Sequence, residues 1–126
     1  MYNRKPYVIL GVLLLALAAG CATANFKRDT YRTLGAAGAT YDAAMKSLSH
    51  LYDTGDIGDA EKAMAIEYGG YFWAAYHTAA DAMVVYMETE NTADEARVTK
   101  AMAMLSQALS RFMDVVQPML AKGGDK

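Results

Sequence analysis

The chain has few of the residues that usually mark a reaction centre or a covalent framework. Its 126 residues include one cysteine and two histidines. A single cysteine excludes an internal disulfide, and the sequence has no spacing typical of a zinc site, a phosphate-binding loop or a nucleophile with its base. We therefore expect no enzyme, no catalytic residue and no metal or side-chain-bound cofactor.

Proline and positive charge are also scarce. The two prolines are Pro6 and Pro118, whereas alanine and methionine, which favour helices, are abundant. Residues 21–126 carry ten Lys and Arg against fourteen Asp and Glu, a net charge of −4. Nucleic acids and anionic lipid headgroups attract basic surfaces, so we expect no nucleic-acid partner. The composition predicts one small all-α domain.

The first twenty residues have the pattern of a secretory signal peptide. Arg4 and Lys5 precede an apolar run over residues 7–19. That run is shorter than the about 20 residues of a membrane-spanning helix and fits a signal core followed by small residues. The sequence therefore predicts a signal helix over residues 1–20 that is cleaved from the mature protein.

The end of this segment, Ala18-Ala19-Gly20-Cys21, resembles the lipobox of bacterial lipoproteins, with Ala18 where leucine is commonest. The resemblance implies cleavage between Gly20 and Cys21 and a diacylglycerol on the Cys21 thiol, which would anchor the protein to a membrane. Ala22, rather than aspartate, follows the cysteine; by resemblance to enterobacterial sorting this favours the periplasmic face of the outer membrane. An ordinary secretory signal and an uncleaved signal anchor are the alternatives.

Two long amphipathic segments follow a short tether over residues 21–25. The first predicted helix covers residues 26–53, with Asn25 as its N-cap. Its apolar positions step by three and four, as in a helix seam: Tyr31, Leu34, Gly38, Tyr41, Met45, Leu48 and Tyr52. The second predicted helix covers residues 59–89, with the same spacing at Ala65, Tyr68, Phe72, Ala75, Ala79, Ala82 and Tyr86. Further apolar residues widen this second stripe, so we expect the second helix to be the most buried.

A third helix is predicted over residues 93–121. Thr92 and Glu95 have the spacing of a capping box, and Pro118 is expected to end or kink the helix. Its seam consists of Val98, Met102, Leu105, Leu109, Phe112, Val116 and Met119. The connections are short, so neighbouring helices must run antiparallel. The predicted fold is an up-down-up three-helix bundle over residues 26–122 with a polar tail at 123–126, and a homodimer that completes a larger bundle is the main variation.

The middle helix carries the strongest candidate for a binding surface, a cluster of aromatic residues and one histidine. The cluster consists of Tyr68, Tyr71, Phe72, Trp73, Tyr76 and His77. Tyrosine and tryptophan are frequent in interfaces, but they also fill cores. We expect Tyr68 and Phe72 to lie in the core and Trp73, on another face, to be partly exposed.

Three further groups of residues have structural interpretations. His77 and Asp81 stand four residues apart, as a metal ligand and its carboxylate would, but one such pair makes no metal site. The acidic residues of 53–61 fail the calcium-loop pattern, so we interpret them as turn and cap residues. The small residues 35–39 would pack on the alanine seam of the middle helix at Ala75, Ala79 and Ala82.

The tether constrains the function. Four residues, fully extended, reach about 14 Å, which holds the bundle close to the membrane. The first hypothesis is a membrane-anchored helical adaptor that binds an envelope protein. The alternatives are a bundle that binds a small ligand or lipid in a tyrosine-lined interior, and an inhibitor or exclusion lipoprotein encoded by a mobile element.

Overall fold

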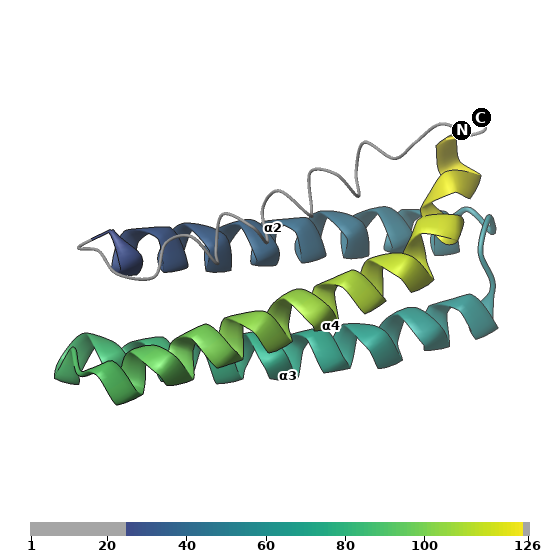
Figure 1. The fold of residues 1–126 in the computed structure, drawn as a ribbon. Coiled ribbons are helices and arrows are strands. Elements are labelled where there is room, and N and C mark those ends of the chain that lie inside the picture. The colour runs from purple at the N-terminus through teal and green to yellow at the C-terminus, as the bar shows by residue number, and fades with distance from the viewer. Residues whose placement is uncertain (1–24, 125–126) are drawn as a thin grey trace, which may run out of the picture. The chain divides into compact units, whose positions relative to one another are not determined.

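The computed structural model describes residues 25–124, which form three α-helices: α2 (Phe26–Asp53), α3 (Asp59–Thr89) and α4 (Thr92–Gly124) (Figure 1). This part of the chain contains no strand. The prediction of an all-α, up-down-up three-helix bundle is confirmed. The predicted signal peptide, Cys21 and residues 22–24 of the tether lie outside the described residues.

The chain divides into two compact units, Met1–Thr33 and Leu34–Lys126. In the described part of the first unit, the Asn25 carbonyl accepts a hydrogen bond from the Asp29 amide at 2.9 Å. Thr33 Oγ1 donates to the Asp29 carbonyl at 2.9 Å. Phe26 and Thr30 are buried there. The first helix therefore begins directly after Asn25, the residue predicted to cap it.

In the second unit, α3 and α4 pack against each other along much of their length (Figure 1). All seven predicted seam residues of α4 are buried, and Val98, Phe112 and Val116 are 0% exposed. The predicted seam of this helix is confirmed. None of the three described helices has an apolar stretch long enough to cross a bilayer.

Helix α2 approaches this pair through a large side chain. The ring of Tyr41 lies 4.6 Å from the ring of Phe72 and 5.1 Å from that of Phe112, centroid to centroid. A Cβ atom on Gly69 would lie 2.9 Å from Tyr41 Oη, whereas Gly70 faces open space. Gly69, the first of the two adjacent glycines of α3, therefore makes room for the close approach of Tyr41.

The predicted seam of α2 is partly wrong. Leu34 and Leu48 are buried as expected, but Tyr31 is 51% exposed. Gly38, Tyr41, Met45 and Tyr52 are only half-buried. The alternate positions that are buried instead are Ala37, Ala44 and Leu51. Both rows alternate steps of three and four around residues 34, 41 and 48, so spacing alone does not distinguish them.

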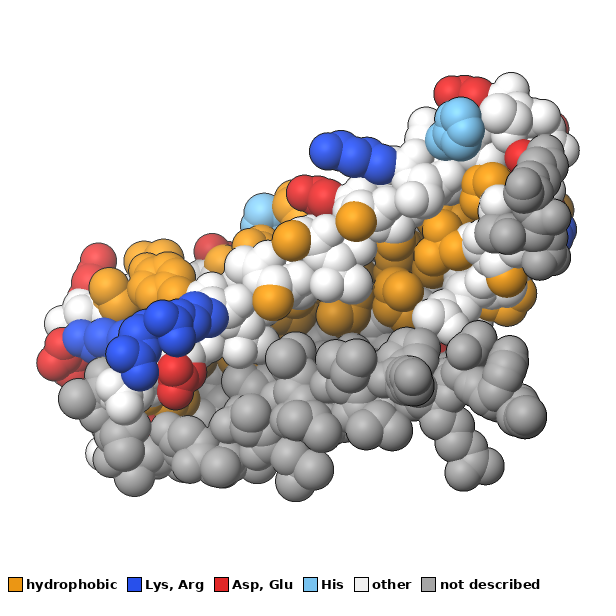
Figure 2. Space-filling model, turned by 90° about the horizontal axis from the view of Figure 1, so that it is seen from above, with side chains coloured by type: hydrophobic (Ala, Val, Ile, Leu, Met, Phe, Trp, Pro, Cys, Tyr) orange, Lys and Arg blue, Asp and Glu red, His pale blue; other side chains and the backbone are white. Residues whose placement is uncertain are grey.

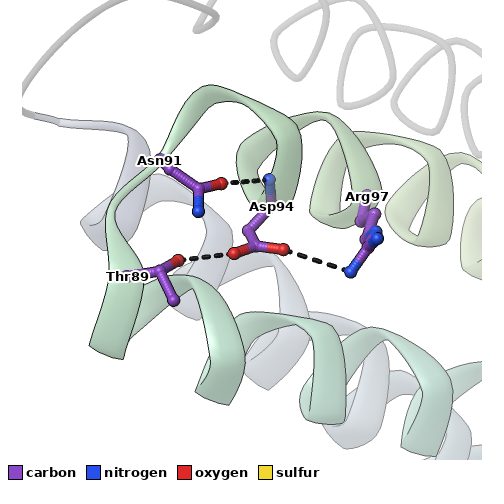
Figure 3. Close-up of polar contacts among 4 residues, drawn as sticks. All are labelled: Thr89, Asn91, Asp94 and Arg97. Atoms are coloured by element: carbon purple, nitrogen blue, oxygen red, sulfur yellow. Dashed lines mark hydrogen bonds and ion pairs between the residues drawn. The ribbon is translucent and has the colours of Figure 1, made fainter.

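The start of α4 also differs from the prediction by one residue. The side-chain oxygen of Asn91, not of Thr92, accepts a hydrogen bond from the Asp94 amide at 2.8 Å (Figure 3). The Asp94 carboxylate is almost buried and accepts from Thr89 Oγ1 at 2.6 Å and from Arg97 Nη1 at 3.3 Å. Asn91 is a strong N-cap residue, and Asp94 then joins the end of α3 to the start of α4.

The opposite end of the helix pair is joined by an ion pair. Lys122 Nζ lies 2.7 Å from Glu61 Oε2, and Glu61 Oε1 accepts from the Gly58 amide at 3.2 Å. These two donors hold the pKa of Glu61 below its ordinary value. Pro118 does not end α4, which continues to Gly124, but the last turns bend aside (Figure 1). Proline removes one backbone donor and crowds the preceding turn, which accounts for a bend.

Candidate functional site

The predicted aromatic cluster of α3 divides into two groups on either side of Phe72. Phe72 is 0% exposed and packs between Tyr41 and the rest of the core. Tyr68 is half-buried, whereas Tyr71 and Trp73 are 58% and 46% exposed. The expected core position of Phe72 and the partial exposure of Trp73 are therefore observed, whereas Tyr68, which was expected in the core, is only half-buried. The cluster is not one continuous surface.

One group centres on Trp73. Its ring stacks on Tyr76 at 5.4 Å with an interplanar angle of 3°, and it meets the His77 ring edge-on at 4.8 Å. The Tyr41 ring lies 6.0 Å away on the α2 side. Burial, with a smaller effect of the nearby Asp42 carboxylate, raises the pKa of Tyr41. The sequence assigned Tyr41 only to the helix seam, and its role in positioning Trp73 was missed because the two residues lie far apart in the chain.

The other group consists of Tyr68 and Tyr71, whose rings meet edge-on at 5.7 Å. Both tyrosines line an open groove of about 850 Å³ between α3 and α4. Its lining includes small residues such as Ala75 and Ala101, and also Arg111. The Tyr71 hydroxyl donates to Glu67 at 3.2 Å, which raises the pKa of Tyr71.

The surface of α3 is the most apolar part of the described surface. Among residues 25–124, nine large hydrophobic side chains are exposed, and seven of them belong to α3: Met64, Ile66, Tyr71, Trp73, Val84, Val85 and Met87. The prediction that α3 is the most buried helix is wrong, because α4 buries nine residues and α3 only six. Figure 2 is seen from above, on the side where Figure 1 draws α2, and there too hydrophobic side chains reach the surface between charged groups.

The polar candidates do not form a ligand site. No hydrogen bond or ion pair joins His77 to Asp81 in the described structure; His77 contacts Trp73 instead. Residues 25–124 contain no group of three or more side chains suited to a metal ion. In the loop before α3, Tyr52 donates to Asp59 at 2.7 Å and Thr54 donates to Asp56 at 2.7 Å. Both bonds join side chains in and beside the loop, and the capping bond of α3 is the one from the Gly58 amide to Glu61.

At its two glycines, the small-residue segment 35–39 packs differently from the prediction. The neighbour of Gly38 is the Tyr76 ring, whose nearest atoms lie 3.5 Å from where a Cβ would be, and Gly35 has open space. At Gly38, helix α2 meets an aromatic ring of α3 rather than the alanine seam of that helix. The space that glycine leaves there is taken by the ring of Tyr76.

Comparison with models of known families, with curated proteins and with solved structures gave no match to this chain.

Proposed function

We propose that this chain is a protein-interaction module of the bacterial envelope, anchored to a membrane through a lipid on Cys21. The observation that supports an interaction role is the concentration of exposed apolar side chains on α3, seven of the nine among the described residues. Exposed apolar side chains gathered on one element are typical of sites where a partner binds.

The anchor rests on the lipobox resemblance at residues 18–21. With Cys21 acylated, about 14 Å of extended chain separates the lipid from Asn25, and α2 begins at the next residue. The module would therefore act close to the membrane surface, and an adaptor or structural role on the periplasmic face of the outer membrane fits this short reach. The partner would be another envelope protein.

The groove between α3 and α4 supports a second candidate function. Its volume of about 850 Å³ lies within the range of small-ligand sites, and its lining is mostly apolar with a few polar groups. A small amphipathic ligand or lipid would bind there, at the surface beside Tyr68 and Tyr71. The interior at Phe72 is filled by Tyr41 and Phe112, so the ligand would not enter the core.

The anchor is tested by metabolic labelling with a radioactive fatty acid in cells that express the full chain. Wild type should be labelled and sediment with the membranes, whereas Cys21→Ser should lose both properties. Equal labelling of the two proteins would contradict the anchor.

The interaction role is tested by photo-crosslinking in cells, with a photoreactive amino acid at Val84 on α3. The matched control places it at Ala103, an exposed position of α4. We expect a discrete crosslinked product from Val84, absent from Ala103 and weakened by Cys21→Ser. If the α3 position gives no product beyond that of the control, the interaction role is wrong.

A further inference from the structure

Four of the exposed apolar residues of α3, together with Gly70, His77 and Ala80, form a second helix seam, which we call the outer row. Its members step by four and three in strict alternation: Ile66, Gly70, Trp73, His77, Ala80, Val84 and Met87. This is the spacing with which one helix packs along another. Ile66 and Val84 are 56% and 57% exposed, Met87 is 40% exposed, and only Ala80 is half-buried.

The outer row is preorganised for binding, because its central side chain is held in place and a groove lies beside it. Trp73, at its middle, is held by stacking on Tyr76 at 5.4 Å and on Tyr41 at 6.0 Å. Gly70 has open space above it, so a neighbouring side chain can approach the backbone there. Beside Ile66 lies a groove of about 270 Å³ between α2 and α3, with Met45 and Ile57 in its lining. A fixed aromatic side chain and a nearby apolar groove lower the entropy cost of docking.

The open edge of the outer row is acidic. Glu67, Asp81 and Glu88 each follow a row member by one residue, so they share one edge of the helix, and all three are exposed. On the α2 side, Asp53 lines the smaller groove. The cation of that groove, Lys62, is held 4.3 Å above the Tyr52 ring. Charges beside a helix seam select the partner, and this edge favours a basic one.

We propose that the outer row binds an amphipathic helix of a partner protein that has apolar side chains at alternating steps of three and four and Lys or Arg along its edge. This inference rests on the proposed function and specifies the partner's chemistry. The apolar row supplies the buried contact, and the acidic edge sets the orientation and rejects acidic helices.

Two other occupants fit the charges less well. A second copy packed antiparallel about His77 would bring Glu67 of one copy toward Glu88 of the other, and like charges at such an edge are destabilising. An anionic membrane surface would likewise repel Glu67, Asp81 and Glu88, because its negative potential attracts basic groups.

Trp73, the only tryptophan of the chain, reports the binding directly. The full chain in phosphatidylcholine vesicles is titrated with a tryptophan-free helical peptide of about 21 residues that has leucine in the seam and lysine along its edges. We expect a saturable blue shift of the emission that weakens at least about tenfold when salt rises from about 50 to about 500 mM. A peptide with glutamate in place of lysine should give no shift.

Matched variants locate the site. Ile66→Ser with Val84→Ser should weaken binding at least about tenfold. Met64→Ser with Met104→Ser removes two apolar side chains, 44% and 53% exposed, that lie outside the outer row and its acidic edge, and it should change nothing. Reversing the edge with E67K, D81K and E88K should exchange the preference of the two peptides. Far-UV circular dichroism checks that every variant keeps its helices.

The opposite results overturn the inference. These are binding of both peptides with equal strength, an equal effect of the two pairs of serine variants, a blue shift caused by phosphatidylglycerol vesicles alone, or a shift that follows self-association in sedimentation. Crosslinking from Val84 in cells together with any of these results would leave the interaction role standing and reject only the basic helix.

Discussion

Helices α3 and α4 have similar lengths and pack against each other, but they distribute their apolar side chains differently. Helix α4 keeps its seam of seven residues on one side, and all seven are buried. Helix α3 has apolar residues around most of its circumference and leaves seven large ones exposed. A one-sided helix serves the core alone, whereas the excess apolar surface of α3 indicates a second contact surface.

The largest expected effect is on the core side of this comparison. Phe112 is 0% exposed and contacts the Tyr41 ring. Phe112→Ala should therefore lower the free energy of unfolding by about 3–5 kcal/mol, because it removes buried surface and leaves a cavity. Val84→Ala on the outer row should change it by no more than about 0.5 kcal/mol. Urea unfolding of the full chain measures both, and equal losses would mean that the outer row belongs to the core.

A smaller loss is expected at the start of α4. Asn91→Ala removes the acceptor for the Asp94 amide and should cost about 1 kcal/mol of stability. Thr92→Ala, the residue favoured by the sequence pattern, should cost less. Thermal unfolding of the two variants decides between the caps, and a larger loss for Thr92→Ala would restore the predicted capping box.

The adjacent glycines Gly69 and Gly70 allow the packed and the open side of α3 to be compared within one helix. Gly70→Ala should stabilise the protein by about 1 kcal/mol, because alanine favours helix and the site has open space. Gly69→Ala should gain less or destabilise, since its Cβ would lie 2.9 Å from Tyr41 Oη. In a Tyr41→Phe background, which lacks that hydroxyl, Gly69→Ala should recover part of the stability that alanine adds in a helix. Chemical denaturation measures these differences.

The smallest effect concerns the ion pair that joins α3 to α4. The pKa of Glu61 is lowered in the folded protein, first by Lys122 and then by the Gly58 amide. Its contribution is therefore present above the unfolded pKa near 4.5 and is lost as the pH falls through the lower folded value. Glu61→Gln should lower stability slightly at neutral pH and not at about pH 3. In a Lys122→Met background the neutral-pH effect should shrink, as a double-mutant cycle would show.

The success of sequence reasoning differed between the two helices for a physical reason. On α4, polar residues separate the apolar positions, so the spacing allows one buried face, and the structure buries it. On α3 the predicted seam is buried at Ala65, Phe72, Ala79 and Tyr86 and half-buried at its other three positions. Apolar residues also occupy other faces of this helix, and the spacing could not tell which of them stay exposed. The same ambiguity affected α2, where the rows through Ala37 and Gly38 fit equally well, and the structure buries Ala37, Ala44 and Leu51.

The candidate site was predictable in its composition but not in its arrangement. The sequence identified the aromatic residues of α3 and the partial exposure of Trp73, because these residues cannot all face one side of a helix. It did not identify Tyr41 as the residue that holds Trp73, since that contact joins positions far apart in the chain. The acidic edge could be related to the choice of a partner only after the outer row beside it was found to be exposed.

The sequence by itself determined the helical class, the positions of the three helices and the seam of α4. It did so through local effects: helix propensity, turn residues and apolar spacing act over a few residues. The tertiary structure alone decided which apolar residues of α3 outside the predicted seam remain exposed. That choice depends on how Tyr41, Phe72 and Phe112 fill the space between helices, and close packing of this kind involves residues that are distant in the chain.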